Sequence, residues 1–538
     1  MKTKTFFVSL AALCACACSN TIDVYVSDPS LESEVKVWKE MISRHDSAVP
    51  GTTTLGYERK VSEAEFPDIR LTGKESKADL VLSIDPGQPE EGFSISGGRV
   101  SGGSAAGVFH ALQYITLETL AGGDLKSLDL TTAPKYAHRG ALLDCCRHFF
   151  SVDEVKSFID ILALNNMNVF HWHLTEDQGW RIEIKKYPLL TEIGSVRDST
   201  SERRYNEHWD KSRNSKPYGP FFYTQDQIRG IVAYASARHI EIIPEIDMPG
   251  HMVAALASYP WLGCVGEGYR VRTKWGISKD VLCLGKESTY QFLKDVLDEV
   301  LELFPGRSIH LGGDEAPRIR WESCPECQAF MKKHGMKKEG ELQKYMAKVI
   351  GDYVREKGRT AIVWDDSIDG GLDSDAVVMN WSMREGRFEK VLGNGNRIIQ
   401  TPKRYCYLDY YQTYEPLKNG ELDGGARRYV PLQRCVEFNP VEGLSAEDAA
   451  KVLGIQGNVW TEHMPGFDQV EFMVLPRLSA LAEVGWGSGM DYDSFIEKFR
   501  SRLAPAYEFF GWVYAPFAID GTEPRSASDE FQAKYVKP

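Results

Sequence analysis

The feature that most constrains the fold is a regular alternation of short apolar segments with amphipathic segments, which begins near Lys135. Strands that alternate with helices favour β–α units and a parallel sheet, because parallel neighbours need a crossover connection between them. Eight segments have the composition of buried strands: 139–145, 168–174, 241–246, 308–311, 361–364, 376–381, 397–401 and 455–460. Helical spacing of apolar residues is found at 152–164, 224–238, 288–304 and 341–357. Eight such units predict an α/β fold of the (β/α)8 TIM-barrel type.

A chain of 538 residues is too long for one ordinary core, so we expect further units around the barrel. The predicted boundaries are a signal peptide at 1–20, a small non-catalytic α/β (α+β) domain at 21–133, the catalytic barrel at 134–490 and a helical tail packing on it at 491–538. In the small domain, strands are expected at 23–27, 78–84 and 92–96, and a helix at 105–120. The long segment 179–222 follows the second barrel strand, and loops of that length are usually functional or disordered.

The first residues predict export. Two lysines precede an apolar run that ends at Leu13, and small residues then alternate with cysteines. This is typical of a secretory signal and too short to span a bilayer. Small residues before a cysteine are typical of a bacterial lipoprotein signal, with Cys18, or alternatively Cys16, carrying the lipid; a plain cleaved signal is the other interpretation. We expect a protein of the bacterial cell envelope (periplasm or outer membrane), lipid-anchored at Cys18, or a secreted one.

Net charge and cysteine content limit which partners, disulfides and metal sites we expect. A net charge of −13 provides no basic surface for nucleic acid or anionic membrane, so we expect membrane contact only through the lipid. Export permits disulfides, and Cys264 and Cys283, which flank a loop-like segment, are the pair expected to form one. Cys324-Pro-Glu-Cys327 has zinc-knuckle spacing, but no second pair accompanies it, so we predict a local disulfide or free thiols there and no metal. Nothing in the sequence indicates the oligomeric state.

Polar and aromatic residues gather at the predicted strand ends, where barrels of this type place their active sites. Two glycines precede adjacent carboxylates, Asp314 and Glu315, after the fourth strand. One of two acids so close is expected to hold a proton near neutral pH, as a general acid needs; alternatively the pair only caps the next helix. The other candidate residues at strand ends are Arg147, Glu176, His251, Trp364, Trp381, Tyr407, Asp409, Trp460 and Glu462.

This set of side chains indicates carbohydrate recognition, because indoles pack on the C–H faces of sugars and charged groups bind hydroxyls. Taken singly, Trp364 and Trp381 are better explained as core residues that close the barrel, and Arg147 has the alternative role of neutralising Asp144. The histidines form no metal-binding spacing, so metal catalysis is the weaker hypothesis.

Six strings, in this order over about residues 135–485, resemble the family 20 glycoside hydrolases, which are exo-acting β-N-acetylhexosaminidases: HRGALLDCCRHFF, NVFHWHLTEDQGWRIEI, EIIPEIDMPGH, IHLGGDE, IVWDD and GNVWTE. The segment before the barrel also resembles the non-catalytic domain of that family. The resemblance implies removal of terminal non-reducing β-linked GlcNAc or GalNAc from glycans, without a cofactor, by a retaining mechanism in which the substrate's 2-acetamido oxygen attacks the anomeric carbon and forms an oxazolinium intermediate.

The resemblance also implies roles for the candidate residues. Glu315 would be the acid and later the base, and Asp314 would bind the acetamide N–H. Tyr407 would donate to the acetamide oxygen and the three tryptophans would wall the acetamide pocket, while Arg147, Asp409 and Glu462 would bind sugar hydroxyls. Glu176 and His251 would support Glu315; many members carry two aspartates where this chain has Glu176-Asp177. Two alternatives stay open: a catalytically inactive, glycan-binding surface lipoprotein, and a glycosidase with a conventional protein nucleophile.

Overall fold

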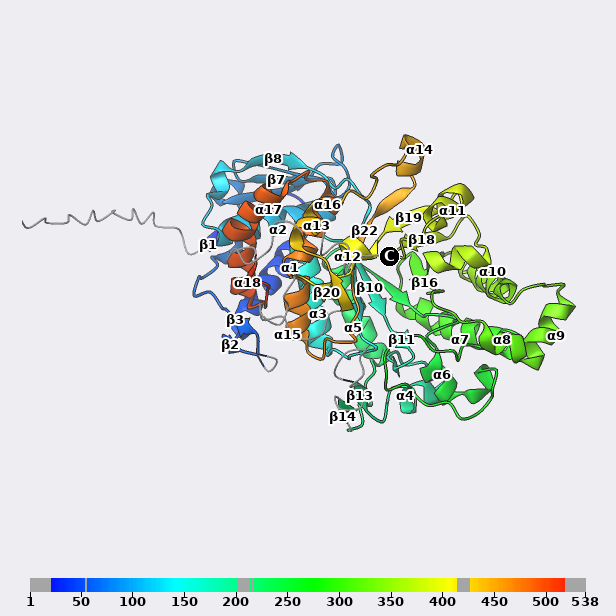
Figure 1. Ribbon diagram of the computed structural model, residues 1–538. Helices are drawn as coiled ribbons and strands as arrows, with labels where there is room; N and C mark the ends of the chain where they lie inside the picture. The colour runs from blue at the N-terminus through cyan, green and yellow to red at the C-terminus, as the bar shows by residue number, and fades with distance from the viewer. Residues whose placement is uncertain (1–20, 54–55, 202–212, 215, 414–425, 518–538) are drawn as a thin grey trace, which may run out of the picture.

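Eight parallel strands close into a barrel at the centre of the computed structural model, which describes residues 21–53, 56–201, 213–214, 216–413 and 426–517 (Figure 1). In barrel order the strands are β9 (His138–Asp144), β10 (Val169–His173), β15 (Glu241–Glu245), β16 (Ser308–His310), β17 (Thr360–Trp364), β18 (Val377–Asn380), β19 (Arg397–Gln400) and β22 (Val452–Val459). Each of the eight segments predicted from the sequence forms one of these strands, so the predicted TIM barrel is confirmed. The parallel register aligns His173 with both Asp144 and Glu245, which brings polar strand ends side by side.

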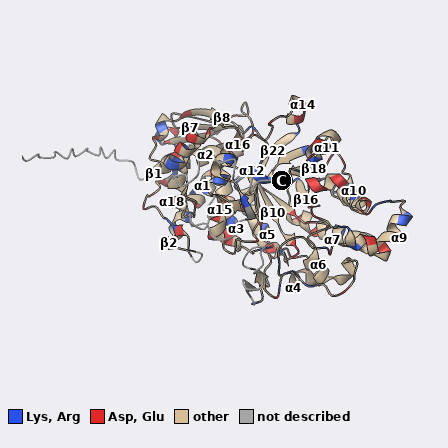
Figure 2. Cartoon of the chain, in the orientation of Figure 1, with Lys and Arg blue, Asp and Glu red and all other residues tan. Residues whose placement is uncertain are grey.

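Amphipathic helices cover the outside of the barrel. The main ones are α3 (Val152–Leu164), α5 (Gln225–Ser236), α7 (Glu287–Leu303), α10 (Gly340–Glu356), α11 (Arg387–Asn394), α15 (Phe467–Val474) and α16 (Arg477–Trp486). α3 has the predicted bounds because Ser151 and Glu154 form a capping box that fixes its first turn. The other three predicted barrel helices differ from the observed ones by one or two residues at each end. Figure 2 shows both signs of charge on the surrounding helices.

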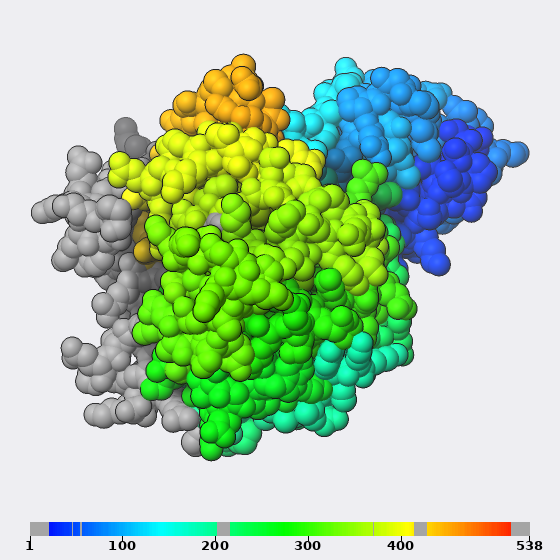
Figure 3. Space-filling model, turned by 90° about the vertical axis from the view of Figure 1, so that its right-hand side faces the viewer, coloured from blue at the N-terminus to red at the C-terminus, as the bar shows by residue number. Residues whose placement is uncertain are grey.

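The N-terminal unit is a mixed six-stranded sheet. Its strand order is β4 (Asp68–Leu71), β1 (Thr21–Val26), β5 (Leu80–Ile84), β7 (Arg99–Gly102), β6 (Phe93–Ser96) and β8 (Asp129–Thr132), and its helices are α1 (Glu32–Ser43) and α2 (Ala105–Leu120). Arg139, at the base of the barrel, donates two hydrogen bonds to Glu91, at 2.8 and 3.0 Å, and so ties this unit to the barrel. In Figure 3 the green and yellow part of the chain covers most of the visible face, with the blue N-terminal unit at its edge.

The last described residues form α17 (Tyr492–Lys498), a wider turn at Phe499–Leu503 and α18 (Ala504–Phe510). They pack against both units: Tyr507 hydrogen-bonds Ser479 of α16, and Arg502 pairs with Glu118 of α2 at 2.5 Å. The rest of the predicted tail, 518–538, and the predicted leader with Cys16 and Cys18 lie outside the described residues. Within the described ranges, no helix combines the length and the apolar character needed to cross a bilayer.

Shorter elements lie in the loops of both units. The small strand pairs are β2 (Gly51–Thr52) with β3 (Glu58–Arg59), β11 (Thr175–Glu176) with β12 (Gly179–Trp180), β13 (Thr200–Ser201) with β14 (Arg213–Asn214), and β20 (Tyr410–Tyr411) with β21 (Ala426–Tyr429). The short helices are α4 (Leu189–Glu192), α6 (Val253–Ser258), α8 (Ile319–Ser323), α9 (Pro325–Lys333), α12 (Lys403–Cys406), α13 (Leu432–Val436) and α14 (Ala446–Ala449). The long segment 179–222 therefore contains local structure of its own where it is described.

Candidate active site

Side chains that follow all eight barrel strands converge on one hollow of about 200 Å³ at the carboxyl ends of the strands. Its lining residues are Arg147, His173, Glu176, Asp247, His251, Asp314, Glu315, Trp364, Trp381, Tyr407, Asp409, Tyr410, Trp460 and Glu462. Every residue that the sequence nominated for catalysis or substrate binding lies in this set. Three further residues, His173, Asp247 and Tyr410, line the hollow although the sequence analysis assigned them no role.

A glycine turn after β16 carries Asp314 and Glu315 into the hollow. Gly312 has a φ of 64°, and a Cβ at this position would overlap the carboxyl group of Asp247. The same carboxyl group accepts a hydrogen bond from the Gly313 N–H at 3.0 Å. Glu315 itself has a φ of 44°, a backbone conformation that costs energy for a residue with a side chain. The surrounding contacts therefore hold the acidic pair in a fixed, strained position.

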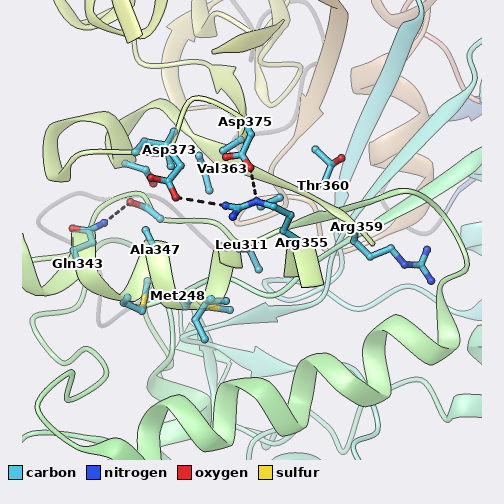
Figure 4. Close-up of a pocket in the computed structure, with 18 of the residues that line it drawn as sticks. Met248, Leu311, Gln343, Ala347, Arg355, Arg359, Thr360, Val363, Asp373 and Asp375 are labelled. Carbon is cyan, nitrogen blue, oxygen red and sulfur yellow. Dashed lines mark hydrogen bonds and ion pairs between the residues drawn. The ribbon is translucent and has the colours of Figure 1, made fainter. Parts of the chain in front are cut away.

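The opposite side of this turn faces a second hollow of about 200 Å³, between α10 and the barrel (Figure 4). Gln343 of α10 donates from its side-chain amide to the Gly313 carbonyl at 2.9 Å, and Met248 and Leu311 line the wall. At the rim, Arg355 pairs with Asp375 at 2.5 Å. The hydrogen bond from Gln343 supports the turn on this side. Neither Asp314 nor Glu315 lines this second hollow.

His251 connects the acidic pair to a buried carboxylate, Glu176. Its Nδ1 lies 2.7 Å from Glu176 Oε1, and its Nε2 lies 3.8 Å from Asp314 Oδ2 and 3.6 Å from Glu315 Oε2. Burial has the largest single effect and lowers the pKa of His251, but the charge and hydrogen bond of Glu176, together with Glu315 and Asp314, outweigh it and raise the net pKa well above its usual value. An imidazolium ion therefore faces both acidic side chains.

Glu176 is held as an anion by the groups around it. Its Oε2 lies 2.8 Å from Arg147 Nη2 and 3.3 Å from His173 Nε2. Burial alone would raise the pKa of Glu176, but the charges of Arg147 and His251 lower it well below its ordinary range. Glu176 is 1% exposed, so water screens this network little.

A second buried carboxylate, Glu245, forms the floor beneath this network. Its oxygens contact His173 Nδ1 at 2.5 Å and His171 and His310 at 3.1 Å each, and they accept a hydrogen bond from the Trp364 indole N–H at 2.8 Å. Burial lowers the pKa of His173, but the charge of Glu245 and the hydrogen bonds to Glu176 and Glu245 raise it to about 10, so one imidazolium and one indole N–H compensate this buried charge. This floor fixes the ring of Trp364 below the hollow.

Asp314 and Asp247 lie together in a mostly buried environment. Burial raises the pKa of Asp314 well above its usual value, and the like charge of Asp247 adds to this effect while His251 opposes it. Burial also raises the pKa of Asp247, to about 7. The Asp314 Oδ1 atom is buried and has no hydrogen-bond partner among the described residues. It is therefore a free acceptor that can receive a hydrogen bond from a bound ligand.

Aromatic rings form the walls of the hollow. Trp381 stacks on Tyr407 with ring centroids 6.0 Å apart, and Trp460 lies 5.9 Å from Trp364 and 6.4 Å from Tyr407. The Trp381 indole N–H donates to Asp366 at 2.9 Å, which fixes the ring plane. Burial raises the pKa of Tyr407 well above its usual value, so its hydroxyl stays a hydrogen-bond donor.

Charged groups complete the hollow on the side of β9, β19 and β22. Arg147 lies over the Trp460 ring at 5.2 Å and pairs with Asp144 at 3.3 Å. The Asp409 Oδ1 atom is buried without a hydrogen-bond partner within the described ranges. Burial raises the pKa of both Asp409 and Glu462. Cation, indole and carboxyl groups side by side match the polar edge and the apolar face of one sugar ring.

The expected disulfide between Cys264 and Cys283 is not formed: both thiols are free. The prediction was wrong because the two cysteines do not form an isolated pair. Cys324 and Cys327, more than 40 residues later than Cys283, lie against the same two thiols, and the spacing along the chain gave no indication of this contact.

Comparisons with known proteins are consistent with this geometry. The family model described as "Glycosyl hydrolase family 20, catalytic domain" matches residues 136–488. A "Beta-hexosaminidase" of Porphyromonas gingivalis is 39% identical over 435 residues, which are 77% of this chain and 53% of that protein, so the match spans about half of that relative. A "Beta-hexosaminidase" of Vibrio furnissii is 35% identical, over 77% of this chain and 67% of its own. The solved GH20 exo β-N-acetylglucosaminidase of Vibrio harveyi, in complex with N-acetylglucosamine, has a TM-score of 0.76 at 28% identity, covering 92% of this chain and 75% of that chain.

Proposed function

The chain belongs to glycosyl hydrolase family 20, and from that membership we propose that it is an exo-acting β-N-acetylhexosaminidase, which removes terminal β-linked GlcNAc or GalNAc from the non-reducing ends of glycans. We further propose a retaining, substrate-assisted mechanism. The observation that carries both proposals is the adjacent pair Asp314–Glu315, which faces one imidazole nitrogen from inside an indole-lined hollow.

The geometry of the pair supports a nucleophile supplied by the substrate. Asp314 and Glu315 both lie within 4 Å of the His251 Nε2 atom, on one side of the hollow. A conventional retaining glycosidase places its acid and its nucleophile on opposite faces of the sugar, roughly 5 Å apart. Asp409 and Glu462 lie elsewhere in the hollow, but burial raises the pKa of each, which makes them poor nucleophiles. The 2-acetamido oxygen of the substrate then takes this role.

Each side chain near the reacting bond has one task in this mechanism. Glu315, whose side chain is 34% exposed, protonates the departing oxygen at the mouth of the hollow and later activates water. The free Oδ1 atom of Asp314 accepts the acetamide N–H, and the positive charge that develops on the cyclising nitrogen favours the ionised form of Asp314. Tyr407 donates to the acetamide oxygen and holds it below the anomeric carbon. Trp364 and Trp381 exclude water from the oxazolinium intermediate.

The size and the charged side of the hollow support exo action. A volume of about 200 Å³ suits one terminal sugar residue. Arg147 and Glu462 bind hydroxyls of this sugar, and Asp409, with its free Oδ1 atom, accepts from another hydroxyl. Because these contacts close the side away from the leaving group, an internal sugar of a longer chain does not fit.

Comparison of three aryl glycosides tests the proposal. We expect turnover of the N-acetyl-β-glucosaminide or the galactosaminide, with β-configured first product by NMR, and no comparable turnover of the β-glucoside, which lacks the internal nucleophile. Glu315→Gln should abolish hydrolysis of substrates with poor leaving groups and keep binding, whereas Glu322→Gln, an exposed glutamate on α8, should behave as wild type. Binding of glycans by the wild-type protein without any hydrolysis would instead support a glycan-binding lipoprotein.

We also propose that the enzyme is exported to the bacterial cell envelope and carries a lipid at Cys18. The basic, then apolar, then cysteine-containing start of the sequence supports this location. Cys18→Ala should move the protein from the membrane fraction to the soluble fraction. Retention of the Cys18→Ala protein in the membrane fraction would point to Cys16 or to another mode of attachment.

A further inference from the structure

Four cysteine side chains from two distant segments meet at one point. Cys283 Sγ lies 3.6 Å from both Cys324 Sγ and Cys327 Sγ, and Cys264 Sγ lies 3.9 Å from Cys327 Sγ. All four sulfur atoms lie within 4.8 Å of one another, and Cys283, Cys324 and Cys327 are buried. A disulfide bond would hold two sulfur atoms about 2.05 Å apart, so none of these spacings is a disulfide.

The spacing between the sulfur atoms fits a tetrahedral metal site. Zinc binds thiolates at about 2.3 Å, and the edge of a tetrahedron is 1.63 times its centre-to-corner distance, so sulfur ligands of one zinc ion lie about 3.8 Å apart. The observed spacings of 3.6, 3.6 and 3.9 Å lie around this value. From this geometry we propose that Cys264, Cys283, Cys324 and Cys327 bind one structural zinc ion.

The backbone around the thiols is arranged as a zinc-binding framework requires. Cys324 occupies the N-cap position of α9 and Cys327 lies in the first turn of this helix, so the helix start fixes the spacing of these two ligands. A Cβ at Gly285 would overlap the backbone of Glu326 and Cys327, so only glycine allows the two segments to approach this closely.

The second pair of ligands comes together through a strand-like contact. Gly263 and Leu282 form an isolated antiparallel bridge, and the Cys283 N–H donates to the Leu262 carbonyl at 2.8 Å. This contact places the neighbouring Cys264 and Cys283 beside each other, although 18 residues separate them in the sequence. The Trp321 indole N–H donates to the Leu282 carbonyl at 2.9 Å and joins this pair to the segment that carries the other two.

The site joins two loops that carry residues of the candidate active site. Cys264 and Cys283 follow β15 and His251, whereas Cys324 and Cys327 follow β16 and the acidic pair. Four protein ligands leave no open coordination position, so the ion is structural and takes no part in the reaction. Its role is to stabilise the loops after β15 and β16 relative to each other.

Metal analysis of the full-length chain, purified without chelator or reductant, tests the inference. We expect about one zinc per chain by elemental mass spectrometry. A thiol-specific mercurial should release it, and release should lower Tm by at least about 5 °C. The double variant Cys283→Ser/Cys327→Ser should lose the zinc, while Cys435→Ser, a buried cysteine of α13 outside the cluster, should retain it.

Cobalt reconstitution gives a second readout that uses the wild-type protein, so it does not require the cysteine variants to fold. Wild-type protein stripped of metal and loaded with Co²⁺ should show the thiolate-to-cobalt charge-transfer band and the visible bands of a tetrahedral site. Either of two results would overturn the inference: disulfides among these four cysteines in non-reduced peptide maps, or four free thiols that take up neither zinc nor cobalt. Since these readouts are independent of hydrolysis, they separate the metal site from the proposed activity.

Discussion

Replacing Glu176 by glutamine should uncouple the candidate acid from its supporting network. One buried carboxylate contacts Arg147 Nη2 at 2.8 Å, His251 Nδ1 at 2.7 Å and His173 Nε2 at 3.3 Å. Glutamine keeps the shape of the side chain and removes its charge, so the three buried cations lose their shared anion. Loss of one partner from a buried ion pair typically costs roughly 3–5 kcal/mol.

The effect on catalysis should follow from His251. At an effective dielectric constant near 20, a unit charge about 4 Å away contributes about 4 kcal/mol, so loss of the Glu176 charge should lower the His251 pKa by on the order of three units. His251 then loses its proton at lower pH, and the alkaline limb of kcat/KM should move in the acidic direction. We expect kcat/KM to fall roughly 10- to 100-fold at neutral pH, as for other supporting groups around a reactive residue.

Asp160→Asn provides the matched control. Asp160 is also a buried carboxylate between two cations, Arg44 at 2.8 Å and Arg238 at 2.7 Å, but it belongs to α3 and faces α5, outside the hollow. Both variants should lower Tm, and only Glu176→Gln should change the pH profile. Because the folded pKa of Glu176 is below 4.5, its contribution to stability is present above that pH and disappears in acid. An unchanged profile in Glu176→Gln would refute the reasoning.

Three further predictions concern the turn and the walls. Asp247→Asn should move the acidic limb of kcat/KM to lower pH by about one unit, because the like charge that raises the pKa of Asp314 is removed; a shift to higher pH would contradict this. Gly312→Ala should lower the free energy of unfolding, measured with denaturant, by more than about 3 kcal/mol. Gly351 lies in a helix with free space around it, so Gly351→Ala should leave the free energy of unfolding unchanged or raise it by up to about 1 kcal/mol. Trp381→Ala should lower kcat/KM for an aryl N-acetylglucosaminide roughly 10- to 100-fold with little change in Tm. A large fall in Tm together with the fall in kcat/KM would instead indicate that the ring has a structural role only.

The barrel could be predicted from the sequence because its strands are buried on both sides and end at polar residues. The N-terminal sheet was predicted less completely. β4, at the sheet edge, reads Asp-Ile-Arg-Leu and buries only its isoleucine, so it lacks an apolar run. β7 reads Arg-Val-Ser-Gly and also lacks an apolar run, and a side chain at its last residue, Gly102, would overlap the backbone of α2. Such strands are set by pairing with neighbours and not by local composition.

Most residues that line the hollow could also be predicted from the strand ends, but the contacts among these residues could not. His173 is tied to Glu245 across 72 residues, and Asp247 matters because the Gly313 N–H donates to it across 66. The four clustered cysteines give the same lesson, since Cys264 and Cys283 join the Cys324–Cys327 pair only through the folded loops. Contacts of this kind depend on tertiary packing, which one sequence without relatives does not reveal.

The most direct test of the account uses the substrate as the reporter. In the proposed mechanism the acetamido oxygen is the attacking atom, held by Asp314 and Tyr407 while Glu315 donates its proton. Fluorination of the acetyl group weakens that oxygen as a nucleophile and leaves the rest of the sugar unchanged. Across the acetyl, fluoroacetyl, difluoroacetyl and trifluoroacetyl aryl glucosaminides, kcat/KM should fall steeply with each added fluorine. A series that stays flat, together with a glycosyl group trapped on a carboxylate of the enzyme, would contradict it.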